Sequence, residues 1–150
     1  MNSIEINKIM NGENWGKNYG GIYPCDRLPQ NLCRKCNFGI ICNLSKSTSL
    51  GTHWIAIFMP EEGECLEYFD SYGIPPNNKY LLSFLEKNNQ SYCYNKGQIQ
   101  NFGSDECGEY CIFFLLLRFS GIEFNTIINI FSNDLEQNDN FISNVIHSLK

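Results

Sequence analysis

Long apolar runs are missing from this 150-residue sequence, and none approaches the roughly 20 residues that a membrane-spanning helix needs. Its opening residues, Met-Asn-Ser-Ile-Glu-Ile-Asn-Lys, lack the charged-then-apolar layout of a secretory signal peptide. Internal repeats and low-complexity tracts are also absent. We therefore expect a soluble, intracellular protein with one domain over residues 1–150, which is long enough to bury a substantial core.

Basic residues are scarce and scattered. The sequence has 11 Lys and Arg against 16 Asp and Glu, a net charge of −5, and Arg34-Lys35 is its one adjacent basic pair. Binding to nucleic acid relies on basic patches that neutralise phosphates. The charge therefore argues against a nucleic-acid partner.

Histidines are even scarcer, with two in the chain, whereas there are eight cysteines. Cys33-x-x-Cys36, with Cys25 or Cys42, has a spacing that can bind zinc, but no histidine and no second close pair accompany it. Without a secretory signal, disulfides are not expected. We expect free, mostly buried thiols and neither a metal nor a required cofactor.

The pattern of apolar residues predicts an α+β fold, a small and mostly antiparallel sheet flanked by helices. Helical periodicity marks residues 4–10, 79–87, 124–131 and 135–149. Strands are predicted at 38–43, at 53–58, at 65–73 and, as an edge strand, at 91–99. Residues 60–64 read as a hairpin turn, and residues 23–29 read as an extended loop with two prolines.

The stretch from Gln100 to Cys111 is the most informative in the chain. A polar, glycine-containing loop runs into the apolar segment 112–117, which predicts a buried helix with Cys107 at its start. Unpaired backbone N–H groups at a helix N-terminus favour a thiolate over a thiol. Cys107 is therefore a candidate nucleophile, although a small buried cysteine at a core helix would show the same pattern.

A cysteine nucleophile needs a base and a group that orients it. His53 opens one predicted strand, and Asp70 lies at the end of the next. In an antiparallel hairpin these two positions fall at the same end of the sheet, so a carboxylate can orient the imidazole. His53, Asp70 and Cys107 form a candidate catalytic set.

These segments look like the motif blocks of the adenain (adenovirus protease) family, which includes proteases of Polinton/Maverick elements and other DNA viruses. The matching blocks are Gly51-Thr52-His53-Trp54, Tyr68 to Gly73 and Gln100 to Gly108, and Trp15 to Pro24 resembles the family's aromatic–glycine start. The resemblance implies the adenain/Ulp-like fold with the nucleophile at the start of a central helix. It also implies His53 as base, Asp70 as its orienting acid, Cys107 as nucleophile and Gln100 as an oxyanion-hole donor.

The acid residue deviates from the adenain pattern, whereas the spacing between Gln100 and Cys107 follows it. Adenovirus enzymes mostly carry Glu at the acid position, whereas Asp70 is typical of the more distant Ulp/SENP proteases. Six residues separate Gln100 from Cys107, which fits adenain, because the Ulp pattern is one residue tighter. Asn101 remains an alternative oxyanion donor.

By resemblance, the chain is expected to be a cysteine endopeptidase that cleaves viral or mobile-element precursor proteins at Gly-containing sites during virion maturation. It would act in the host-cell nucleus or viral factory and in the virion. Trp54, with Gly51 and Gly103, would form a narrow substrate channel, although Trp54 alone would also suit a core aromatic. A peptide activator is a further implied partner, with Cys93 as a conceivable attachment point.

Two other functions stay open. The same site would suit a deubiquitinase or deSUMOylase acting on Gly-Gly tails of ubiquitin-like modifiers. The chain would alternatively be an inactive, cysteine-rich zinc or interaction module.

Overall fold

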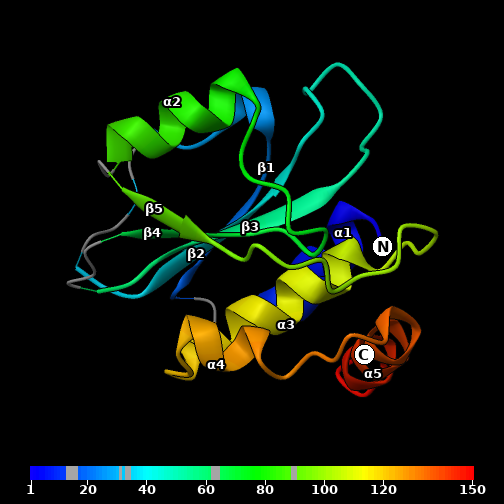
Figure 1. Ribbon diagram of the computed structural model, residues 1–150. Helices are drawn as coiled ribbons and strands as arrows, with labels where there is room; N and C mark the ends of the chain where they lie inside the picture. The colour runs from blue at the N-terminus through cyan, green and yellow to red at the C-terminus, as the bar shows by residue number, and fades with distance from the viewer. Residues whose placement is uncertain (13–16, 31, 33–34, 62–64, 89–90) are drawn as a thin grey trace.

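A mixed β-sheet separates helices on its two faces (Figure 1). The computed structural model describes residues 1–12, 17–30, 32, 35–61, 65–88 and 91–150. Over these residues the sheet has five strands in the order β1-β2-β3-β4-β5. The strands are β1 (Tyr19–Pro24), β2 (Phe38–Asn43), β3 (Trp54–Met59), β4 (Leu66–Phe69) and β5 (Tyr92–Tyr94).

The central pairs β2–β3 and β3–β4 are antiparallel, as expected, whereas the outer pairs β1–β2 and β4–β5 are parallel. The α+β class is therefore confirmed, with a sheet that is antiparallel at its centre and parallel at both edges. The β3–β4 register pairs Ala56 with Phe69, so the residue before β3 and the residue after β4 emerge at one end of the sheet.

The helices are α1 (Ser3–Met10), α2 (Lys79–Asn88), α3 (Cys107–Phe119), α4 (Phe124–Ile128) and α5 (Leu135–His147), with a 3₁₀ turn at Cys25–Arg27. Figure 1 shows α2 on one face of the sheet and α1, α3, α4 and α5 on the other. In the described part of the chain, no helix has the length and apolarity needed to cross a bilayer.

Helix α3 is apolar almost all round, as a buried central helix must be. It packs on β3 and contacts α1 and α5, and its residues 110–115 are buried. A separate apolar cluster lies on the other face of the sheet, beneath α2. The start of α3 is therefore mounted on a rigid core.

Two sequence predictions needed correction at the sheet edges. The structure has a strand, β1, in the segment 19–24 that the sequence presented as a glycine-rich stretch and loop. A Cβ at Gly20 would lie 2.2 Å from the Phe38 ring, so glycine is what allows β1 to pack against β2. The predicted edge strand 91–99 ends at Tyr94, because the following residues leave the sheet. The turn predicted at 60–64 lies partly outside the described residues.

Candidate active site

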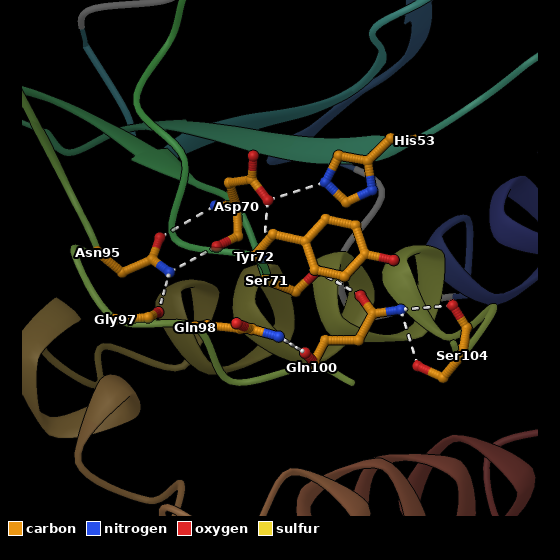
Figure 2. A network of polar contacts seen from close by, with 9 residues as sticks. All are labelled: His53, Asp70, Ser71, Tyr72, Asn95, Gly97, Gln98, Gln100 and Ser104. Atoms are coloured by element: carbon orange, nitrogen blue, oxygen red, sulfur yellow. Dashed lines mark hydrogen bonds and ion pairs between the residues drawn. The ribbon is translucent and has the colours of Figure 1, made fainter. Parts of the chain in front are cut away.

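His53 and Asp70 meet at the end of the β3–β4 hairpin, as the sequence predicted. His53 immediately precedes β3 and Asp70 immediately follows β4. The His53 Nε2 atom lies 2.8 Å from Asp70 Oδ1, and the Asp70 side chain is almost completely buried (Figure 2). A buried carboxylate at this distance fixes both the orientation and the tautomer of the ring.

A tight turn, Asp70-Ser71-Tyr72-Gly73, shapes the acid end of this pair. The Tyr72 backbone N–H donates to Asp70 Oδ1 at 2.8 Å, and the Gly73 N–H donates to the Asp70 carbonyl. Gly73 has φ +68°, and a Cβ there would lie 2.6 Å from the Gly97 backbone, so the turn requires glycine. The turn also brings the Tyr72 ring onto the His53 ring, with centroids 4.6 Å apart.

Cys107 is the first residue of α3, as predicted, and it is partly exposed. The imidazole of His53 bonds Asp70 and lies under the electrostatic influence of Cys107. Burial lowers the pKa of His53, but its interactions with Asp70 and Cys107 raise the pKa further, to about 9. At neutral pH His53 is therefore protonated, and an imidazolium beside a cysteine at a helix start favours the thiolate.

Gln100 is buried in the loop before α3. Its Oε1 accepts a bond from the Ser71 hydroxyl, and its Nε2 lies 3.0 Å from both the carbonyl and the hydroxyl of Ser104. The amide thus ties the Asp70 turn to the nucleophile loop (Figure 2). Donation to an oxyanion would require it to exchange a bond to Ser104, and this role stays a prediction, as does that of exposed Asn101.

A cleft of about 750 Å³ opens beside Cys107. Gly51 and Trp54 line it, as predicted, and the Trp54 indole donates to the Met1 carbonyl at 3.3 Å. A Cβ at Gly51 would lie 2.8 Å from the Asn43 amide, so Gly51 lets the cleft wall close onto β2. Gly103 lies in the exposed nucleophile loop and is not part of the cleft lining.

For the cysteine spacing that could bind zinc, the described residues contain no group of three or more His, Cys, Asp or Glu side chains placed to hold a metal ion. Cys33 itself lies outside those residues, as do Trp15 and Gly16 of the adenain-like start. Cys93 lies with its sulfur 3.1 Å from that of Cys65. A role in attaching an activator stays a prediction.

Three features of the site were not anticipated from the sequence. Residues 1–3 and Asn7 form one wall of the cleft, the Tyr72 ring covers the imidazole, and the Asn95 side chain holds the backbone of Asp70. The sequence could have indicated Tyr72 as a site residue, since Tyr72 lies in the same motif as Asp70. The other two depend on contacts between distant segments, for which the sequence carries no local signal.

No family model matches the chain. The SUMO-1 cysteine protease S273R of African swine fever virus (isolate Tick/South Africa/Pretoriuskop Pr4/1996) is 26% identical over 141 residues, covering 86% of this chain and 48% of the relative. The R355 protein of Acanthamoeba polyphaga mimivirus is 33% identical over 155 residues, covering 86% of this chain and 51% of the relative. The chain thus spans about half the length of these curated relatives.

Solved structures show the same fold. The African swine fever virus pS273R protease superposes with a TM-score of 0.65 at 17% identity, over 94% of this chain and 65% of that chain. The effector Cdu1 of Chlamydia trachomatis, solved bound to ubiquitin, superposes with a TM-score of 0.53 at 19% identity, over 75% of this chain and 60% of that one. At these identities the likeness concerns the fold.

Proposed function

Because the chain is related to the viral cysteine protease S273R and to R355, we propose that residues 1–150 form a cysteine protease domain in which Cys107 is the nucleophile. The observation that carries this proposal is the His53–Asp70 bond of 2.8 Å, on an imidazole whose pKa is also raised by Cys107, the first residue of α3. The three groups come from separate parts of the chain, and Cys107 lines the cleft.

The reaction is acyl transfer at a peptide carbonyl. The Cys107 thiolate attacks the carbonyl carbon and forms a C–S bond, and the C–N bond then breaks as protonated His53 gives its proton to the leaving amine. Water next attacks the thioester, His53 takes a proton from it, and the C–S bond breaks to release the new carboxylate. Asp70 keeps the ring oriented and stabilises its positive charge throughout.

Charge develops on the carbonyl oxygen during both attacks. We assign the Cys107 backbone N–H as one oxyanion donor, because it lies among the unpaired amides at the start of α3. The Gln100 amide is the second donor that the family resemblance implies. Removing one such donor typically costs about 3 kcal/mol of transition-state stabilisation.

The substrate we propose is a viral precursor protein cleaved at a Gly-containing site. Trp54 and Cys107 both line the cleft, and the rest of the lining is mainly Asn, Ser and Thr side chains, which suit the peptide groups of an extended, small-residue chain. On this reading the protein acts within the infected cell and in the assembling particle, with a peptide activator as a possible partner.

A second candidate is cleavage after the Gly-Gly tail of a ubiquitin-like modifier. Two likenesses favour it: one relative is named as a SUMO-1 cysteine protease, and one structure of the same fold was solved bound to ubiquitin. The same nucleophile and channel would serve either substrate.

A direct comparison separates the two. The purified protein is incubated with a library of Gly-containing peptides and, in parallel, with ubiquitin and SUMO carrying a C-terminal electrophile, and Cys107→Ala serves as the blank. Cleavage of internal Gly sites without modifier labelling supports the precursor protease. Labelling by a modifier at far lower concentration than any peptide would support the second candidate, and no reaction in either arm would contradict a protease.

A further inference from the structure

The Asn95 side chain continues the sheet where the main chain of β5 leaves it. The last paired residues of β4 and β5 are Tyr68 and Tyr94. Beyond them, Asn95 Oδ1 accepts a bond from the Asp70 N–H at 3.0 Å, and Asn95 Nδ2 donates to the Asp70 carbonyl. The carboxamide thus occupies the place of a peptide unit and binds both backbone groups of one residue.

Asn95 and His53 lie on opposite sides of Asp70 (Figure 2). Asn95 is 2% exposed and Asp70 is 1% exposed, so neither backbone group of Asp70 can turn to water if the carboxamide is removed. A buried donor or acceptor that loses its partner is costly, and the local backbone would move to find another.

Such a movement would reach the imidazole. Asp70 Oδ1 accepts from both His53 and the Tyr72 N–H, which places that oxygen at a position set by the backbone of the turn. The neighbouring Ser71 carbonyl accepts from the N–H groups of Ile99 and Gln100, so the segment that begins at Asn95 holds two consecutive residues of the turn.

We propose that Asn95 is a positioning residue of the active site, which acts through the backbone of Asp70 to hold the carboxylate against His53. It touches neither substrate nor nucleophile. The proposal deepens the proposed function and rests on it for the effect on catalysis, whereas its structural part concerns the His53–Asp70 pair alone.

The protonation of His53 reports on this pair directly. Its titratable neighbours are Asp70, Cys107 from α3 and the stacked Tyr72, with Asp105 near Cys107 in the cleft lining. If Asn95→Ala lets the carboxylate drift, the ring loses the bond that raises its pKa. The pKa of His53 should then fall toward its ordinary value.

The test is NMR titration of protein with labelled histidine. The chain has two histidines, and exposed His147 on α5 serves as an internal reference. Asn95→Ala should lower the pKa of His53 from its raised value toward 6.5. Cleavage of a Gly-containing peptide should slow at least tenfold in kcat/KM, because small misplacements of catalytic groups are costly.

Asn88 provides a matched control. It is also a buried Asn that bonds main-chain groups, accepting from the Leu32 N–H and donating to the Phe84 carbonyl, but on helix α2. Asn88→Ala should cost similar stability and leave the His53 titration unchanged. A folded Asn95→Ala protein in which His53 titrates as in the unmodified chain would overturn the proposal.

A second variant and a hydrogen-exchange measurement keep the proposal testable if Asn95→Ala does not fold. In that case Asn95→Ser, which keeps a hydroxyl near the Asp70 N–H, is titrated in the same way. In the unmodified protein the Asp70 amide should exchange as slowly as the core of β3, and rapid exchange would contradict the clamp. If the unmodified chain cleaves nothing, the proposed function fails while the titration still decides the role of Asn95.

Discussion

At the scale of single residues, His53 connects the acid and the nucleophile. One ring nitrogen bonds Asp70, Cys107 interacts electrostatically with the ring and raises its pKa, and Tyr72 covers one of its faces. Stacking and the buried carboxylate leave the imidazole few alternative orientations. In the proposed mechanism the protonated ring is both the counter-ion of the thiolate and the proton donor to the leaving amine.

The first prediction concerns pH. With the His53 pKa raised from 6.5 to about 9, the charged ring and its bonds stabilise the folded chain fully below pH 6.5, and this contribution is lost as pH rises through 9. Activity should fall over the same alkaline range. Asp70→Asn removes the charge that supports the imidazolium, so the alkaline limb of kcat/KM should move to lower pH and the rate should drop about a hundredfold or more.

Histidine substitutions provide the control for this prediction. His53→Ala should abolish turnover in a folded protein, whereas exposed His147→Ala should leave kcat/KM unchanged. An active His53→Ala protein, or an alkaline limb that Asp70→Asn does not move, would refute the assignment of His53 as the catalytic base.

The second prediction concerns thiol reactivity. Iodoacetamide near neutral pH should modify Cys107 before the other cysteines, because Cys107 is partly exposed and interacts electrostatically with an imidazolium at a helix start. Cys111, one turn later, is fully buried, and burial raises its pKa well above the ordinary range. Peptide mapping after brief labelling reads the order, and Cys111→Ala should not change the rate at Cys107. If Cys36 were labelled before Cys107, the assignment of Cys107 as the nucleophile would be wrong.

At the scale of elements, one buried ion pair ties helix α3 to the sheet. Arg118 donates from Nε and Nη2 to the two oxygens of Glu67 on β4, at 2.7 and 2.9 Å, and its guanidinium lies over the Phe58 ring. Burial raises the pKa of Glu67, and Arg118 offsets part of that rise. The pair thus joins the helix that starts with Cys107 to the strand that ends before Asp70.

The third prediction tests this connection. Arg118→Met leaves Glu67 buried without its partner and should lower the free energy of unfolding by about 3–5 kcal/mol. The double variant with Glu67→Met should recover most of that loss, since no charge remains buried. Urea unfolding measures both, and Lys150→Ala, which breaks the half-exposed pair with Glu109 at 3.6 Å, should change stability by under about 1 kcal/mol.

Local sequence patterns predicted the strands and helices whose residues show a clear alternation, apolar run or helical period. Strand β2 has the predicted bounds, because an apolar run from Phe38 ends in a polar loop, and α2 follows a clear helical period. Strand β1 contains two glycines and ends in proline, so its pairing with β2 was not visible. Strand β5 is short because Asn95 turns from main-chain pairing to side-chain pairing, a choice that depends on Asp70 in another element.

The same distinction holds in the site. Helix-start chemistry pointed to Cys107, and hairpin geometry placed His53 beside Asp70. The cleft wall could not be inferred, because the Trp54–Met1 contact joins residues 53 positions apart and no pattern in either segment predicts it.

At the scale of the whole molecule, the cleft is assembled from parts of the chain that are distant in sequence. Its lining comes from residues 1–7, from the strand ends, from the loop 43–52 and from the start of α3. Trp54 contacts the N-terminal wall through Met1, and both residues lie against Gly108, next to Cys107 in the chain. Substrate access is therefore set by tertiary packing and not by one loop.

The fourth prediction concerns this access. Peptides with Gly before the scissile bond should be preferred, and Gly→Val there should reduce kcat/KM more than about a hundredfold, since a displaced carbonyl loses its attack geometry. Trp54→Ala should relax the preference, whereas Trp54→Phe, which keeps an aromatic wall but loses the bond to Met1, should largely keep it. Equal cleavage of Gly and Val peptides by the unmodified protein would show that the channel does not select.

The place of Met1 has a consequence for any chain joined to it. Met1 lines the same cleft as Cys107, so a segment attached ahead of it leaves the fold beside the nucleophile. Tethered there by a short flexible linker, the segment would meet the thiolate at an effective concentration on the order of millimolar, whatever the protein concentration. A Gly-containing linker in a fusion ahead of Met1 would then be cut within its own molecule, at a rate that dilution does not change.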